Sequence, residues 1–237
     1  TSPTLQRLVP ANLRDPQGKW YALTRRARVP IVNPAIVDPA SIKTYADLAN
    51  PALKGKLCLR NRKSPYNQSL VADQIILRGE AATAKWIRGM ANNVTQEFFP
   101  KDTPQVQAVG KGKCGVAVVN TYYVGRMLAG RKGADNKALA EKVRVVFPNP
   151  THVNVSGAGV TASSDNPEAA LKLIEFLASP NAGKGYAAAN LEYPVKGFGD
   201  NPILRSWGTF KADGVSVEQL GAKNKQAQQL MKDNGWK

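Results

Sequence analysis

The adjacent tyrosines Tyr122 and Tyr123 are the side chains of this 237-residue sequence that are best placed to share one ligand. The apolar, β-branched run Val116–Val119 that precedes them predicts a buried strand. Asn120 can then cap a helix over residues 122–128, so that both phenols lie where a strand gives way to a helix N-terminus. In open α/β sheets this edge is where ligands bind.

A third tyrosine, Tyr66, has the same predicted surroundings. Residues 56–60 predict a strand, Ser64 can cap a helix, and that helix continues until Gly79. Tyr66 is therefore in the first turn of a helix that follows a strand. A simpler interpretation, in which these rings only pack in the core or lie half-buried on the surface, stays open at this point.

Three phenols at one point predict a particular chemistry. A phenol has a pKa near 10, so ionising one at pH 7 costs about 4 kcal/mol, and only a strongly charged Lewis acid would stabilise three phenolates together. Phenolate is a hard, anionic oxygen ligand, which favours Fe³⁺ over zinc or copper(I). The helix N-termini also favour negative charge at this place. The pattern therefore predicts a ferric site, with Fe²⁺ as an open alternative.

The formal net charge of +16 suits an anionic ligand, an anionic surface or nucleic acid. The basic residues are spread along the chain, with short clusters at residues 25–28 and 60–63. The sequence has no zinc-finger spacing, RNP-type aromatic strand or basic zipper. We therefore expect no nucleic acid as a partner, with nonspecific binding kept as an alternative, and a small anion can complete the coordination of the metal. No apolar run is long enough to span a bilayer.

The remaining residue types with distinctive chemistry are few. The two cysteines, Cys58 and Cys114, have no cysteine or histidine at metal-ligand spacing, and each lies in a predicted strand of neighbouring βα units. Two free thiols and one disulfide are both compatible with this, and the neighbouring units favour the disulfide. The sole histidine, His152, is expected to be a structural hydrogen-bonding group. No catalytic triad, nucleophile elbow or phosphate-binding loop occurs, so we expect no enzyme.

Strand and helix patterns alternate along the chain, which predicts an α/β fold with a parallel or mixed sheet. Residues 19–29 predict a strand that ends before a proline-punctuated connection. Residues 42–48 predict a short helix. Two separate helices are expected at the C-terminal end, over residues 217–220 and 223–231.

Taken together, the residues resemble the periplasmic ferric-iron-binding proteins of bacterial ABC transporters, in particular the cyanobacterial iron-uptake branch. The element Asn120-Thr-Tyr-Tyr123, with Tyr66 before it, is specific to this family. The other matching stretches are residues 10–15, 20–28, 45–51, 54–60, 66–69, 152–159, 192–195 and 233–236.

The resemblance implies that Tyr66, Tyr122 and Tyr123 are iron ligands and that Arg26 lies behind them or faces a bound anion. It also supports a Cys58–Cys114 disulfide. It implies a monomeric extracytoplasmic protein of the periplasm that binds Fe³⁺, in some cases with a synergistic small anion, and delivers it to an ABC permease in the inner membrane. A small-anion-binding protein of the same fold, which uses Arg26 and helix N-termini, is the alternative.

The implied fold is a two-lobed type II periplasmic binding protein with mixed sheets and hinge crossovers. Residues 1–25 and 150–200 would form the first lobe, and residues 26–149 and 201–237 the second lobe with the tyrosines. Hinges are expected near residues 25–30, 148–152 and about 200. Family members begin with a further stretch that often supplies a histidine or tyrosine ligand, so we expect the first lobe to be incomplete in this chain.

Overall fold

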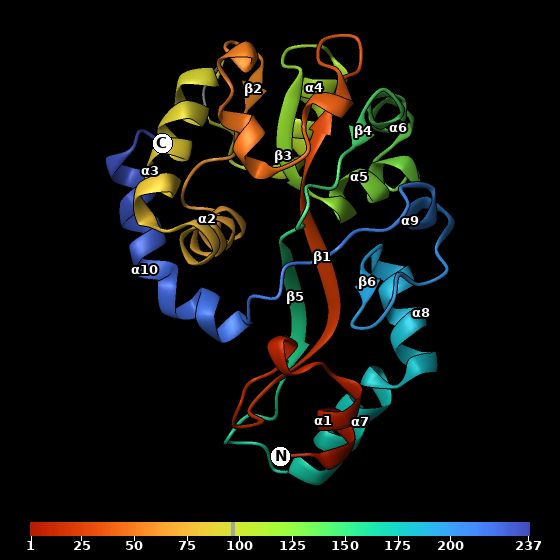
Figure 1. Cartoon of the computed structure of the whole chain (residues 1–237). Coiled ribbons are helices and arrows are strands. Elements are labelled where there is room, and N and C mark those ends of the chain that lie inside the picture. Colours follow the sequence, from red (N-terminus) through yellow and green to blue (C-terminus); the bar gives the residue numbers. More distant parts are fainter. Residues whose placement is uncertain (96–97) are drawn as a thin grey trace.

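One long strand, β1 (Tyr21–Val32), runs through the middle of the molecule and belongs to two sheets. In the computed structural model, which describes residues 1–95 and 98–237, the C-terminal half of β1 lies in the upper part and its N-terminal half in the lower part (Figure 1). Every residue of β1 is buried or half-buried. Although the strand contains one threonine and three arginines, the rest of the fold covers both of its faces.

The upper sheet has the strand order β2-β3-β1-β4. Strand β3 (Val116–Asn120) is antiparallel to β1, with Arg28 opposite Asn120, and β2 (Leu57–Cys58) is parallel to β3. Strand β4 (Arg144–Val145) pairs with the other edge of β1. The mixed sheet that the sequence predicts is therefore confirmed, and it places the C-terminal end of β3 directly before a helix.

The lower sheet is formed by β5 (Val153–Ala158) and β6 (Tyr193–Pro194), which both pair antiparallel with the N-terminal half of β1. Three helices lie around it in Figure 1: α1 (Pro3–Leu8), α7 (Pro167–Ala178) and α8 (Pro180–Asn190). Buried side chains of α1 and α7 form one apolar core with the start of β1, in which Leu5 and Ala22 are fully buried.

Helices cover both faces of the upper sheet. Strand residues such as Val116 and Val118 face one core with α2, α3 and α10, whereas Ala117 and Val119 face another with α4, α5 and α6. This alternation is the side-chain period of a strand with both faces buried. The helices are α2 (Pro65–Arg78), α3 (Glu80–Asn93), α4 (Asp102–Gly110), α5 (Thr121–Leu128), α6 (Ala134–Glu141), α9 (Pro202–Ser206) and α10 (Val217–Asp233).

Three sequence-based boundaries were wrong. Strand β1 does not end at residue 29, because Pro30 still lies opposite Val118 and its carbonyl accepts a hydrogen bond from Val146. The short helix starts later than expected, as a 3₁₀ helix over Tyr45–Ala49. Each difference reflects contacts with the rest of the fold rather than local composition.

The third error is at the C-terminal end, where one helix, α10, replaces the two that were expected. Gly221 does not interrupt it. Ser216 and Gln219 form a reciprocal capping box at its start, and Leu220, Ala227 and Met231 bury one face of the helix against the upper core. This burial outweighs the roughly 1 kcal/mol that a glycine costs inside a helix.

Cys58 of β2 and Cys114, just before β3, form a disulfide across a sequence separation of 56 residues. Both residues are buried, and the bond joins two strands that lie side by side in the upper sheet. The pairing is the one that the resemblance implied. Among the described residues, every helix is either too short or too polar to span a bilayer.

Removing this disulfide is expected to destabilise the protein by about 4 kcal/mol. In the chain-entropy model the effect grows with the number of residues in the loop that the bond closes, because the bond restricts the unfolded chain. The change is Cys58→Ala together with Cys114→Ala. The measurement is urea unfolding, compared with the unaltered protein in the presence and absence of a reductant. Equal stability of the oxidised and reduced forms would contradict the prediction.

Candidate metal centre

The tyrosine pair lies at the N-terminus of α5. Strand β3 is buried along its whole length and ends at Asn120, whose backbone is still extended, so the helix begins directly at the sheet edge. The rings of Tyr122 and Tyr123 stack, with centroids 4.3 Å apart and planes 29° apart. Adjacent residues of a helix usually point about 100° apart, so this stacking turns both phenols toward one region.

Tyr66 comes to the same place from the first turn of α2, which follows β2 as α5 follows β3. The hydroxyl of Tyr122 donates a hydrogen bond to the hydroxyl of Tyr66 at 3.2 Å. Tyr122 is 5% exposed, whereas Tyr66 and Tyr123 are half-buried. The structure thus brings all three predicted tyrosines together, and each belongs to the first turn of α2 or α5.

Burial raises the pKa of the Tyr122 phenol well above its usual value of 10, and its hydrogen bonds with Tyr123 and Tyr66 raise it further. Without a cation the group is therefore a neutral phenol at neutral pH. A cation that reaches the cluster would have to supply the free energy of deprotonation. A trivalent ion with strong affinity for oxygen does so more effectively than a divalent one.

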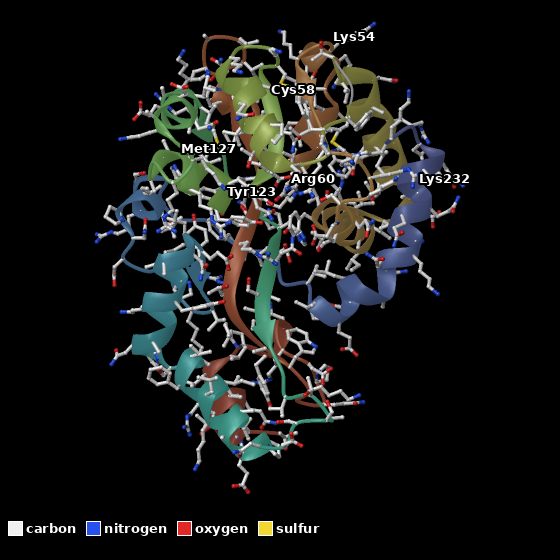
Figure 2. The ribbon with its side chains drawn as sticks, turned by 180° about the vertical axis from the view of Figure 1, so that it is seen from behind. Lys54, Cys58, Arg60, Tyr123, Met127 and Lys232 are labelled. Atoms are coloured by element: carbon white, nitrogen blue, oxygen red, sulfur yellow. A yellow bond between two sulfur atoms is a disulfide. The ribbon has the colours of Figure 1, made fainter. Side chains whose placement is uncertain are left out.

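Four guanidinium groups surround the phenols. Those of Arg26, Arg28 and Arg60 face the ring of Tyr66, with carbon-to-centroid distances of 5.5, 5.8 and 5.3 Å. Arg126, one turn along α5, lies 4.6 Å from the centroid of Tyr122. Figure 2 shows Tyr123 and Arg60 near the point where β1 and β5 enter the upper part of the molecule. These contacts place positive charge directly beside the aromatic rings.

Arg28 is held by a fully buried set of polar groups. Its guanidinium donates to Asp102 of α4 at 2.6 Å and to Asn67 of α2 at 2.6 Å. It also lies 3.3 Å from the side-chain oxygen of Asn120. Asp102 in turn accepts from the backbone N–H of Asn120 and pairs with Arg60 at 3.1 Å. The network fixes the starts of α2 and α5, and with them the positions of the tyrosines.

Several buried polar atoms on β1 and at these helix starts have no hydrogen-bond partner within the described residues. Arg26 donates one guanidinium N–H to the carbonyl of Val155 at 2.6 Å, but its Nε has no partner. The same holds for Ser64 Oγ, Asn120 Nδ2 and Thr121 Oγ1. Buried polar groups are nearly always satisfied in native proteins, so these atoms are suited to a ligand with hydrogen-bonding groups.

The structure separates the predicted residues into two groups. Arg26 faces the ring of Tyr66, whereas His152 is buried against Asp73 and Asp213 and does not contact the tyrosine rings. Sequence reasoning missed Asp102 and Arg126, and it noted Arg28 and Arg60 only as members of basic clusters. A buried guanidinium and a solvated one have the same local sequence signal, so only the fold distinguishes them.

Comparison with known proteins identifies the class. Residues 2–214 match the family described as bacterial extracellular solute-binding protein, and the chain belongs to that family. The solved structure of Trichodesmium FutA (IdiA), described as a complex with iron and citrate, covers the whole chain with a TM-score of 0.95 at 38% identity. The chain covers 76% of that structure. The predicted type II periplasmic binding protein fold is thereby confirmed.

Two curated relatives are similarly informative. Iron uptake protein A1 of Synechocystis is 42% identical over 241 residues, which cover all of this chain and 67% of the relative. The major ferric iron-binding protein of Neisseria meningitidis serogroup B is 29% identical over 228 residues, covering 92% of this chain and 65% of the relative. The predicted resemblance to ferric-iron-binding proteins is confirmed.

The substitution Asp102→Ala is expected to cost about 3–5 kcal/mol of unfolding free energy, because it leaves the buried Arg28 charge without its carboxylate. Chemical denaturation measures the effect. The control is Glu141→Ala, which removes the carboxylate of an exposed pair with Lys137 and should change stability by less than about 0.5 kcal/mol. Equal effects of the two substitutions would show that the buried pair has no special role.

Proposed function

We propose that this protein binds Fe³⁺ through the phenolates of Tyr66, Tyr122 and Tyr123 and carries it for uptake. The observation that supports this most directly is the contact between the hydroxyls of Tyr122 and Tyr66, from two different helix starts, with Tyr123 stacked beside them. Relatives named for ferric iron binding and iron uptake share the fold and cover nearly the whole chain. The iron is the cargo rather than a resident cofactor.

We also propose that a small oxyanion completes the coordination of the iron. The partnerless Nε of Arg26 and the neighbouring guanidinium of Arg126 offer donors and positive charge beside the phenols. A carboxylate or carbonate would satisfy these donors and place an oxygen on the metal. The related Trichodesmium structure is described as holding citrate together with iron.

Capture and release would depend on two lobes. We propose that residues 1–25 and 150–200 form one lobe and residues 26–149 and 201–237 the other, with hinges near residues 25–30, 148–152 and about 200. In the family, such a protein serves an ABC transporter. We therefore propose a monomer in the periplasm that delivers iron to a permease and has no enzymatic activity.

A second candidate function is the binding of a small anion without iron. The buried, partnerless Nε of Arg26 is the observation in its favour. Both candidates use the same cluster of residues but differ in whether they need the tyrosines. Only the iron-binding function needs the phenol oxygens, whereas the anion-binding function needs the guanidinium groups.

Titration with ferric iron from a weak carrier chelate is expected to produce a visible phenolate-to-iron charge-transfer band. Tyr123→Phe and Tyr66→Phe should each weaken the band and lower the ferric affinity by more than about a hundredfold, since even groups that only support a ligand contribute 10- to 100-fold. The matched control is Tyr186→Phe, on α8 at 37% exposed. A band that survives loss of Tyr123 and Tyr66 would contradict the proposed ligands.

The role of the anion is tested by the same titration with and without citrate. Arg26→Gln is expected to abolish most of the increase in ferric affinity that citrate gives, while the tyrosine band remains. The control is Arg88→Gln, an exposed arginine of α3 that contacts Asn234. Citrate binding that needs no iron, survives Tyr123→Phe and is lost in Arg26→Gln would instead favour the second candidate function.

A further inference from the structure

His152 lies in a second buried cluster of charged groups, beside Ser69, which is one turn along α2 from Tyr66. Its Nδ1 is 3.3 Å from Asp213 Oδ2 and 3.7 Å from Asp73 Oδ1. The side chains of all three residues are at most 2% exposed. Asp73 Oδ1 has no hydrogen-bond partner within the described residues, so His152 is the cation that faces this oxygen.

The other side of the imidazole is also held. Nε2 lies 3.0 Å from the hydroxyl of Ser69, which can accept from a protonated Nε2. The amide nitrogen of Asn154, 3.5 Å away, is itself a donor and does not bond to that proton. Hydrogen bonds on both ring nitrogens fix the ring plane, and a ring that donates from both nitrogens is an imidazolium. One positive charge between two carboxylates leaves the cluster itself with a net negative charge.

The cluster joins the three segments that meet in the middle of the molecule: residues 26–28 of β1, residues 151–154 at the start of β5, and residues 211–213 between α9 and α10. Figure 1 shows these segments side by side. The N–H of Arg28 donates to the carbonyl of His152. Thr151 donates to the carbonyl of Lys211 and accepts from the N–H of Asp213. We call these three stretches the central segments.

Tyr45 fastens the central segments to the upper part of the molecule. Its hydroxyl accepts from the backbone N–H of His152 at 2.9 Å and donates to the carbonyl of Arg28 at 2.6 Å. Asp73 adds a second attachment, because it belongs to α2, the helix that carries Tyr66. The charged groups that face the imidazole are thus Asp73 from α2 and Asp213 from the third central segment, while the phenol of Tyr45 contacts the backbone N–H of His152.

We propose that His152 is a positioning residue that holds the three central segments together. It thereby limits how far the upper and lower parts of the molecule move apart. Separating the segments would leave Asp73 and Asp213 without the cation between them, and a buried carboxylate without a partner is costly. If the segments are held tightly together, release of the metal should be slower. This part of the proposal rests on the proposed function.

The charge state of His152 follows from its surroundings. Burial disfavours the charged ring and lowers its pKa, but hydrogen bonds and Coulombic attraction to Asp213 and Asp73 outweigh burial and raise the pKa to about 9. A pKa above the unfolded value of 6.5 means that the stabilisation is complete below pH 6.5 and is lost as the pH rises through about 9. The cluster is therefore fastened at neutral pH and loosens only in alkaline solution.

Amide hydrogen exchange of the metal-free protein at neutral pH tests the fastening. His152→Gln is expected to increase exchange in residues 26–28, 151–154 and 211–213 by at least about tenfold, which corresponds to losing one buried hydrogen bond. Tyr45→Phe keeps the ionised cluster but removes the hydroxyl that bridges the His152 N–H and the Arg28 carbonyl, and it should produce the same local pattern. It serves as the second variant in case His152→Gln fails to fold.

The control variant is Asn93→Ala, which removes buried hydrogen bonds to the carbonyls of Leu48 and Asn50, away from the central segments. It is expected to lower stability without selective exchange in the central segments. If Tyr45→Phe and Asn93→Ala give the same exchange pattern, the proposal is overturned, because the effect would then be general destabilisation.

The pH dependence gives an independent readout. The difference in unfolding free energy between the unaltered protein and His152→Gln should shrink as the pH rises from about 6 to about 10, and titrating tyrosines cancel from this difference. A constant difference would overturn the proposal. Tight binding of one equivalent of zinc that is lost in His152→Gln would also overturn the proposal. Asp73, His152 and Asp213 would then form a metal site.

Iron release separates this proposal from the proposed function. Faster iron release from Tyr45→Phe than from Asn93→Ala supports both. If the protein fails to bind iron but the exchange pattern appears, the proposed function fails and the fastening role of His152 stands. If iron binds and the exchange pattern is absent, the fastening role fails and the proposed function stands.

Discussion

The buried charge of Arg28 is the constraint on which the rest of the structure depends. A guanidinium without exposure is costly unless it is paired, and here Asp102, Asn67 and Asn120 come from three different elements to bond its two terminal nitrogens, while its Nε has no partner within the described residues. These neighbours sit at or beside the starts of α2, α4 and α5. Satisfying this one charge therefore fixes where α2 and α5 begin. The three tyrosines lie in the first turns of these two helices.

The same residue connects the site to the middle of the molecule through its backbone. Its side chain faces Tyr66, while its N–H and carbonyl bond to His152 and Tyr45. A shift of β1 at this point would disturb both sets of contacts. We infer that the metal centre and the central segments are mechanically linked through Arg28, since a packed core with satisfied hydrogen bonds resists small deformations.

The sequence predicted the parts of this arrangement that have local signals. The placement of Tyr66, Tyr122 and Tyr123 followed from apolar strands, capping residues and the first turns of helices, and the structure brings these residues together. The burial of Arg28 and Asp102 has no local signal, because it results from elements that meet only in the folded chain. The full length of β1 was missed for the same reason, since burial on both faces overrides the break that Pro30 suggests.

The large positive charge has a physical use at the proposed site. Deprotonating three neighbouring phenols at neutral pH is unfavourable, and burial makes it more so for Tyr122. Four guanidinium groups lie 4.6 to 5.8 Å from the ring centroids of Tyr66 and Tyr122 and place positive charge beside the phenols. They also repel a bare cation, so charge on the phenolates must develop as the metal arrives. An oxyanion beside Arg26 would reduce that repulsion, which explains physically why such a site would take iron and anion together.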